Sequence, residues 1–221
     1  QIRFKFPSDT KYPCLPVRTD HGLVFPLEGE TYVASPEIEL ALSLNAEIKI
    51  EYGVVIPWLN EVRPFQQFSK SVRENREAEK EAGRKGGLFE LLWKDMGNSV
   101  YGKTAQGLRK KRVYDSRADE SADLPPSKIT QPFLAAYTTS IIRAVLGELL
   151  ATLPVRCTLV SVTTDGFLYN GELKDLNTSG PLSQFFADLA GRVKGERDFL
   201  EIKHNFIPQI LCCKTRGQAS V

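Results

Sequence analysis

The chain of 221 residues has few of the residues that build disulfide frameworks and zinc sites. It has four cysteines and two histidines, and no two of the cysteines form a C-x-x-C pair. Structural zinc sites need about four such ligands at short, regular spacings, so this pattern argues against one. Proteins that depend on disulfides are mostly secreted and carry more cysteine. The sequence therefore predicts buried, reduced thiols in an intracellular protein.

Long apolar runs and a strong net charge are also missing. No apolar run is expected to reach the roughly 20 residues of a membrane span, and the chain does not start with a signal-peptide pattern. The net charge is only +2, so any nucleic-acid binding must come from local basic clusters. The hydrophobic fraction of 42% is ordinary for a folded protein with a sizeable core. No membrane partner is expected.

Strand patterns dominate the first part of the chain. Residues 1–35 alternate between short apolar runs and turn residues, which predicts short strands. Ser35 followed by Pro36 is typical of a helix start, with Ser35 as the N-cap, and the helix is expected to continue to about Asn45. Residues 47–57 alternate and then become apolar, which predicts a strand, and residues 58–64 are expected to form a connection.

Helices and hairpins alternate in the rest of the chain. A charged helix over 65–82, a reversal at Gly83, Gly86 and Gly87, and a second helix from Leu88 predict an antiparallel helical hairpin. Residues 119–127 have the composition of a loop. A long apolar helix is expected over 132–153, a β-hairpin over 156–170, a helix over 182–193, and strands over 200–202 and 209–214. The fold class is therefore α+β.

The second helix of the helical hairpin carries the most specific pattern. Lys94, Asn98 and Tyr101 stand at i, i+4 and i+7, so a helix places a cation, an amide and an aromatic ring on one face. The cation suits a phosphate and the ring can stack on a sugar or base. Gly102 is expected to end the helix. A basic run follows, made of Lys103, Arg109, Lys110, Lys111 and Arg112. The alternative interpretation is a surface helix with a solvated polar face.

The segment K-D-M-G-N-S-V-Y-G resembles the K-x-x-x-N-S-x-Y-G motif on the fingers helix of family B DNA polymerases. Lys94, Asn98, Ser99, Tyr101 and Gly102 match its fixed positions. The resemblance implies that residues 65–103 are the fingers hairpin, between two parts of an antiparallel palm sheet at 1–64 and 104–221. The short fingers are similar to the viral, plasmid and organellar branch that primes from a protein.

The resemblance implies a role for each matched residue. Lys94 and, from the facing helix, Arg76 and Lys80 would bind the nucleotide triphosphate, with Arg73 as a possible substitute for Arg76. Asn98 and Tyr101 would line the nucleotide pocket, with Tyr101 against the sugar. Three further residues, Gly102, Lys103 and Arg109, would contact the DNA backbone, where a basic run is best suited to bind phosphates.

Residues 163–166 form the predicted turn of the β-hairpin. On local signals alone, Asp165-Gly166 is a favoured hairpin turn with no chemistry. Family B polymerases, however, carry D-T-D on a hairpin at this distance from the fingers, and Thr164 and Asp165 match its last two letters, while Thr163 replaces the first. The resemblance implies that Asp165 is the catalytic metal ligand for two Mg²⁺ ions, with Mn²⁺ as an alternative, and that Thr164 contacts DNA.

Two further elements of the family are less complete. Lys214-Thr215-Arg216-Gly217 resembles the K-x-Y element whose lysine meets the primer terminus, but Arg216 stands in place of the tyrosine. The other metal-binding aspartate of the family belongs to a D-x-x-S-L-Y-P motif, and residues 1–64 do not contain it. The chain is therefore expected to be the middle piece of a larger polymerase.

The predicted function is template-directed DNA synthesis, in which deoxynucleotides are added to a primer 3'-hydroxyl by two-metal phosphoryl transfer. The implied partners are a DNA template-primer, deoxynucleoside triphosphates and, in the protein-primed branch, a protein primer. An intracellular location is expected, in the cytoplasm, nucleoid, an organelle or a virus-infected cell. Two alternatives stay open: an inactive polymerase remnant that only binds nucleic acid, and an unrelated α+β domain with accidental motif matches.

Overall fold

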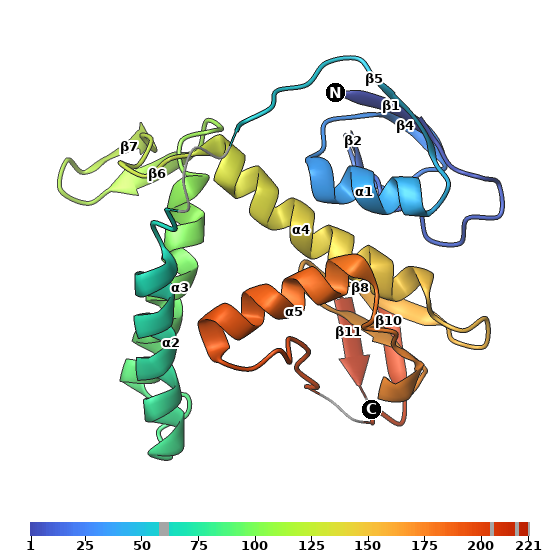
Figure 1. The fold of residues 1–221 in the computed structure, drawn as a ribbon. Helices are drawn as coiled ribbons and strands as arrows, with labels where there is room; N and C mark the ends of the chain where they lie inside the picture. The colour runs from blue at the N-terminus through green and yellow to red at the C-terminus, as the bar shows by residue number, and fades with distance from the viewer. Residues whose placement is uncertain (58–61, 204–205, 215–216, 221) are drawn as a thin grey trace. The chain divides into compact units, whose positions relative to one another are not determined.

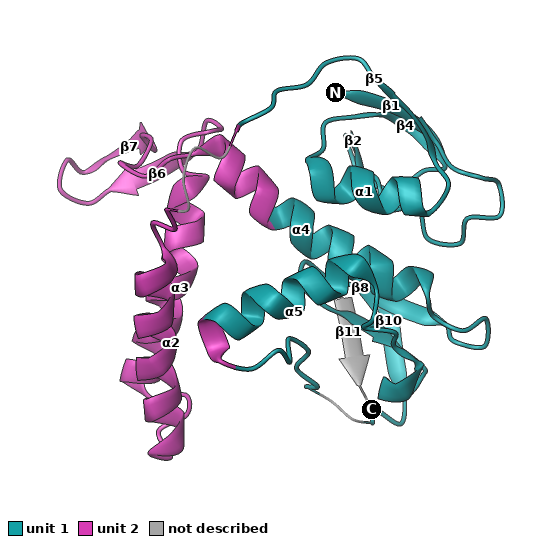
Figure 2. Ribbon diagram, in the orientation of Figure 1, with its two compact units in different colours: residues 1–56, 139–192, 196–221 teal, residues 57–138, 193–195 magenta. Residues whose placement is uncertain are grey.

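Five α-helices and several small antiparallel sheets make up the described part of the chain (Figure 1), which confirms the α+β class. The computed structural model describes every residue except 58–61, 204–205, 215–216 and 221, so the predicted connection over 58–64 lies partly outside the described residues. The chain divides into two compact units (Figure 2). Unit 1 holds residues 1–56, 139–192 and 196–221, and unit 2 holds 57–138 and 193–195. The predicted boundaries of the palm and the fingers describe functional subdomains, which this division into compact units does not test, so they stay predictions.

A three-stranded antiparallel sheet opens unit 1. Strand β1 (Ile2–Lys5) lies between β4 (Glu28–Thr31) and β5 (Glu47–Ile50). The predicted strand over 47–57 is wrong beyond Ile50. Ile50 pairs with Ile2, and Gln1 is the one residue of the partner strand that precedes Ile2. The carbonyl oxygen of Gln1 accepts from the backbone nitrogens of both Glu51 and Tyr52, so the regular pairing ends there. A separate hairpin joins β2 (Val17–Thr19) to β3 (Gly22–Val24).

Helix α1 (Ser35–Ser43) is joined to the long helix α4 (Pro132–Ala151) by a partly buried ion pair. Glu37 is 1% exposed and its Oε1 accepts from Arg143 Nε at 2.7 Å. The same carboxylate accepts from the backbone nitrogen of Ala34 at 3.4 Å, so Ala34 is the N-cap and the prediction of Ser35 was wrong. The positive charge of Arg143 thus compensates the negative charge of the buried Glu37 inside unit 1.

The end of α4 supports the hairpin of β8 (Leu159–Val162) and β9 (Phe167–Tyr169). Leu150, Leu153 and Cys157 form a buried cluster, and apolar side chains of the hairpin pack against it. The prediction of this β-hairpin is confirmed, as is the helix that precedes it.

A single carboxylate fixes the start of α5 (Pro181–Lys194). Glu148 accepts hydrogen bonds from the backbone nitrogens of Leu182 at 3.1 Å and Ser183 at 2.7 Å, and from Ser183 Oγ at 2.6 Å. These are donors that a helix N-terminus leaves free. A Cβ atom at Gly180 would lie within 2.6 Å of the Glu148 carboxylate, so a larger residue there would displace the carboxylate from the helix end.

The last part of unit 1 differs in one place from the prediction. Strand β10 (Ile210–Lys214) pairs with β11 (Gly217–Ser220), as expected for residues 209–214. The predicted strand over 200–202 was wrong, because those residues have no strand partner in the described part of the chain. Instead, the Asp198 carboxylate accepts from the backbone nitrogen of Leu200 at 3.1 Å, which turns the chain.

Unit 2 contains the predicted helical hairpin, made of α2 (Gln66–Glu81) and α3 (Leu88–Thr104). Gly83 and Gly86 have positive φ angles of 73° and 79°, which the reversal requires. Helix α3 continues through Gly102, so the predicted helix end was wrong. One glycine costs a helix only about 1 kcal/mol relative to alanine, and the hydroxyl of Thr104 donates to the carbonyl of Tyr101 at 2.7 Å.

A small hairpin follows α3, formed by β6 (Arg112–Asp115) and β7 (Glu120–Asp123). The predicted loop over 119–127 was wrong for β7, whose polar sequence E-S-A-D gives no strand signal. Cross-strand pairing overrides this composition, and Asp119, with a φ angle of 57°, makes the turn.

Helix α4 is, among the described residues, long and apolar enough to span a membrane by length and composition. Its best window has a mean hydropathy of 1.4, which corrects the expectation that no apolar run reaches that length. A buried core helix passes the same test, and Ala144 and Leu149 of α4 have no exposed surface. A single helix of this kind is therefore weak evidence for a membrane span.

Candidate active site

Asp165 stands at the turn between β8 and β9. The turn is closed by Thr163, whose backbone nitrogen and hydroxyl both donate to the carbonyl of Gly166, at 2.8 Å and 3.1 Å. Asp165 is exposed, and its carboxylate makes no hydrogen bond or ion pair with any residue that the structure describes. A carboxylate presented in this way is available to a cation.

The base of this hairpin is closed by Asp175, which lies in a short 3-10 helix (Leu173–Asp175). Its carboxylate accepts from the Arg156 guanidinium, from the backbone nitrogen of Glu172 at 2.9 Å and from Cys157 Sγ at 3.7 Å. The backbone N–H of Glu172, followed by the charge of Arg156, lowers the pKa of Asp175. One side chain thus joins the segments that enter and leave the hairpin.

The donor set for a divalent metal consists of one carboxylate at this hairpin. Hard cations such as Mg²⁺ prefer carboxylate oxygens, so Asp165 is a suitable ligand. No group of three or more His, Cys, Asp or Glu side chains that could hold a metal occurs within the described ranges. Asp165 alone does not make a complete site for such a cation within the part of the chain that the structure describes.

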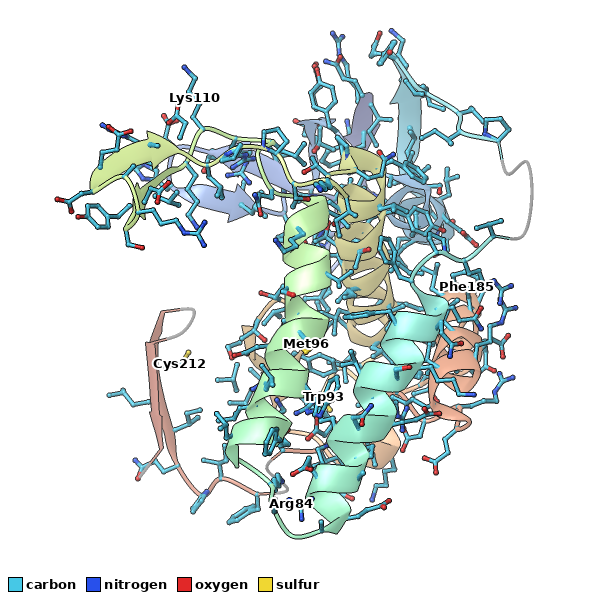
Figure 3. All side chains as sticks on the ribbon, turned by 90° about the vertical axis from the view of Figure 1, so that its left-hand side faces the viewer. Arg84, Trp93, Met96, Lys110, Phe185 and Cys212 are labelled. Carbon is cyan, nitrogen blue, oxygen red and sulfur yellow. The ribbon has the colours of Figure 1, made fainter. Side chains whose placement is uncertain are left out.

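The nucleotide-binding residues predicted on α3 share one face of the helix. Lys94, Asn98 and Tyr101 are all exposed, and Tyr101 retains 42% of its surface. The side chains of Lys94 and Asn98 have no hydrogen-bond partner in the described part of the chain. Figure 3 shows neighbouring Trp93 and Met96 on the same helix. The face can therefore meet a ligand that offers phosphate and a planar ring.

The predicted cations of α2 are engaged inside the hairpin. Arg76 Nε donates to Oε1 of Glu90 at 2.6 Å, and Lys80 Nζ donates to Oε1 of Glu77 at 3.0 Å. The hydrogen bond from Arg76 is the main cause that lowers the pKa of Glu90. Sequence reasoning missed Glu90, although its position four residues before Lys94 puts it on the same face of α3.

Arg73, the possible substitute for Arg76, has spare donor capacity. Its Nη1 atom is buried and has no hydrogen-bond partner among the described residues. An unpaired buried donor costs about 1–3 kcal/mol, so an acceptor at this nitrogen would be favourable.

The predicted DNA contacts lie on exposed backbone and side chains. Gly102 has no atom within 4 Å of an added Cβ, Lys103 is exposed, and Arg109 belongs to the segment before β6, next to Lys110 (Figure 3). Thr164 is exposed beside Asp165. Arg112, by contrast, donates through Nη2 to the carbonyl of Ser121 at 2.7 Å, within its own hairpin.

The K-x-Y-like element lies mostly outside the described residues. Lys214 ends β10, but its side chain is not described, and Thr215 and Arg216 lie outside the described ranges.

The predicted site residues are divided between the two compact units. Asp165 belongs to unit 1, whereas unit 2 holds Lys94, Asn98, Tyr101, Arg76 and Lys80.

Comparison with known proteins gives a relative that is named as a DNA polymerase. The primer-independent DNA polymerase PolB of Escherichia coli is 48% identical over 226 residues, which cover 98% of this chain and 26% of the relative. The chain therefore spans about a quarter of the length of that polymerase. No protein-family model and no solved structure matches the chain. The identity over nearly the whole chain shows that it is related to a DNA polymerase.

Proposed function

We propose that this chain is part of a longer family B DNA polymerase that performs template-directed DNA synthesis. The observation that carries the proposal is the exposed Asp165, which has no partner among the described residues and stands at the turn of a firmly supported hairpin, in a chain related to a DNA polymerase. Deoxynucleoside triphosphates and a DNA template would be its partners, which fits the expected intracellular location.

Asp165 is the proposed catalytic and metal-binding residue. Two bound Mg²⁺ ions, or Mn²⁺, would supply activation of the attacking hydroxyl and neutralisation of the leaving pyrophosphate. Asp165 contributes one anchoring carboxylate, and the packing of β8 and β9 on the Leu150–Cys157 cluster keeps that carboxylate in place. A second acid would come from a part of the longer polymerase outside the described residues.

The α2–α3 hairpin is the proposed nucleotide-binding fingers. Lys94 and Arg76, with Lys80, would bind the triphosphate, while Asn98 would hydrogen-bond the nucleotide. Tyr101 would lie against the sugar, where its ring can exclude a ribonucleotide hydroxyl. The remaining predicted contacts would hold the template and primer backbones through phosphates; these are Gly102, Lys103, Arg109, Thr164 and Lys214.

Primer-independent initiation is part of the proposal. The relative's name describes a polymerase that needs no primer, and 48% identity over this segment favours the same ability in the longer polymerase. It would join the first nucleotides on a template and then extend their 3'-hydroxyl. Priming from a protein is the other possibility that the compact fingers suggest.

The test is an incorporation assay with the full-length polymerase on single-stranded templates, with and without a primer, in Mg²⁺ or Mn²⁺. Wild-type protein is expected to incorporate deoxynucleotides as the template directs, and Asp165→Ala is expected to lose incorporation while retaining DNA binding. Residual metal-dependent synthesis by Asp165→Ala would remove Asp165 from this role. Synthesis only from the primed template would remove primer independence.

The second candidate is an inactive polymerase remnant that binds nucleic acid. Thr163 in place of the family's first aspartate favours it, since Asp165 is then the only carboxylate at the turn. A mobility-shift assay combined with the incorporation assay separates the two candidates. Template binding by wild-type protein that never incorporates a nucleotide would favour the remnant.

A further inference from the structure

Arg76 is held by a buried carboxylate on the opposite helix of the hairpin. Glu90 has a side chain that is only 5% exposed, and its Oε1 accepts from Arg76 Nε at 2.6 Å. Its other oxygen, Oε2, accepts from the backbone nitrogen of Gly86 at 3.2 Å. Both oxygens are engaged, so Glu90 cannot turn without breaking one of these bonds.

The contact with Glu90 uses one of the three guanidinium nitrogens of Arg76. Only Nε donates to the carboxylate, and the two terminal nitrogens make no hydrogen bond within the part of the chain that the structure describes. Arg84, at the turn of the same hairpin (Figure 3), gives both Nε and Nη2 to Glu79, at 2.6 Å and 2.9 Å. Arg84 is therefore committed to its partner, whereas Arg76 is oriented and still has donors to offer.

Glu90 continues the proposed nucleotide-binding face of α3 by one turn. Glu90, Lys94 and Asn98 are spaced four residues apart, which places them in one row along the helix. The ion pair with Glu90 therefore fixes the guanidinium of Arg76, which comes from α2, beside this row. Arginine recognises phosphate with two parallel N–H donors, and the terminal nitrogens of Arg76 can provide them.

We propose that Glu90 is a positioning residue, which holds Arg76 by Nε so that the two terminal nitrogens of Arg76 bind a phosphate of the incoming deoxynucleoside triphosphate. The inference rests on the proposed function and adds a residue that the motif does not contain. A side chain fixed before binding loses less conformational entropy on binding. Glu90 therefore raises nucleotide affinity without touching the nucleotide.

The opposite role for Glu90 makes the opposite prediction. A carboxylate that merely occupied the phosphate position would have to be displaced, and its removal would tighten nucleotide binding. Glu90 is buried and bonded at both oxygens, which favours a fixed support over a displaceable ion. Its lowered pKa, caused first by Arg76, keeps it ionised at neutral pH.

The experiment measures KM and kcat for deoxynucleotide incorporation by the full-length polymerase carrying Glu90→Gln. Glutamine keeps the shape but has a single acceptor oxygen, so it can serve either Arg76 Nε or the nitrogen of Gly86, not both. We expect KM to rise about tenfold, as for the loss of one charge-assisted hydrogen bond, while kcat changes by less than about twofold. Glu90→Asp, which keeps the charge, is expected to recover part of the affinity.

Glu79→Gln is the matched control, because it removes an equally short ion pair from the same hairpin without involving a proposed nucleotide ligand. It is expected to leave KM unchanged. Thermal unfolding of each variant detects a general loss of structure. In an Arg76→Gln background, Glu90→Gln should raise KM no further.

Three results would overturn the inference: an unchanged or lowered KM in Glu90→Gln, an equal rise in Glu79→Gln, or an additive effect in the Arg76→Gln background. Each of these leaves the proposed function intact, because the wild-type enzyme still incorporates nucleotides. Absence of template-directed incorporation by the wild type would instead remove the proposed function, and this inference with it.

Discussion

Two hairpins of unit 1 carry an aspartate in a turn that runs from a threonine to a glycine. In the β2–β3 hairpin, Thr19 donates through its hydroxyl to the carbonyl of Gly22 at 3.0 Å, and Asp20 lies between them. In the β8–β9 hairpin, Thr163 donates to Gly166 at 3.1 Å, and Asp165 lies between them. Both aspartates are exposed. The threonine-to-glycine hydrogen bond is therefore common to the turn of Asp20 and to the turn of the proposed catalytic Asp165.

The support beneath the two turns is different. Leu23 and Val24 of β3 are 46% and 44% exposed, so that hairpin has little apolar anchoring. The β8–β9 hairpin packs Val162 and Phe167 on the buried end of α4, and its base is joined by Asp175. Catalysis requires a carboxylate held within a fraction of an ångström of its working position. The two hairpins thus differ in their anchoring, and the better anchored one carries the aspartate that is proposed to be catalytic.

The largest difference is expected between the two aspartates themselves. Asp165→Ala should lower the incorporation rate of the full-length polymerase by at least about a thousandfold, because the proposed metal-binding carboxylate is lost. Asp20→Ala, at the matched turn, should leave the rate within about twofold. Steady-state incorporation with saturating nucleotide measures both. Equal losses in the two variants would show that the turns are equivalent and would break the comparison.

The next difference concerns the stability that each hairpin contributes. Phe167→Ala removes a ring packed on the Leu150–Cys157 cluster and should destabilise the protein by about 2 kcal/mol, somewhat less than a fully buried phenylalanine. Phe25, just after β3, is 45% exposed, and Phe25→Ala should cost less than about 1 kcal/mol. Urea unfolding of the two variants measures the difference. A larger cost for Phe25→Ala would contradict the assignment of the better anchor.

Asp175 gives the anchored hairpin a dependence on pH. Its pKa is lowered in the folded state, so its stabilising effect is present above the unfolded pKa of about 3.9 and is lost as pH falls through the lower folded pKa. Asp175→Asn should lower the midpoint of thermal unfolding by a few degrees at pH 7, and the gap to wild type should close below about pH 4. Asp20→Asn is the control, because that carboxylate has no such partners among the described residues. A gap that persists in acid would mean that the charge of Asp175 does not contribute.

The smallest effect is expected from the hydroxyls that both turns share. Thr163→Val and Thr19→Val each remove one exposed hydrogen bond to a glycine carbonyl, so each should cost about 0.5 kcal/mol. Equal values from urea unfolding would show that the turns are energetically alike and that the anchoring alone separates them. A much greater loss of unfolding free energy in Thr163→Val would show that the turn itself also contributes to the difference between the two hairpins.

Local patterns predicted the elements that local forces determine. The helical periodicity and the positions of the glycines predicted the α2–α3 hairpin, and the spacing of the apolar residues predicted α4. The Asp165-Gly166 pair gave the β8–β9 turn, and the four-residue spacing put Lys94 and Asn98 on one face. These features depend on neighbours within about four residues, so the sequence displays them directly.

Contacts between distant segments could not be predicted in this way. Strand β7 forms because β6 pairs with it, although its own residues are polar. Glu90 stands 14 residues from Arg76, and Asp175 stands 19 residues from Arg156. An acid and a base at such separations occur throughout the chain, so only the folded arrangement selects these pairs.

The close approach of Glu148 to Gly180 constrains how this sequence can change over time. The carboxylate that caps α5 leaves no room for a Cβ atom at position 180, so any substitution of Gly180 alone would force Glu148 off the helix end. Relatives that replace Gly180 should therefore also have replaced Glu148. Positions 148 and 180 are expected to be inherited as a pair, and their covariation across homologues would reveal a contact that neither residue reveals alone.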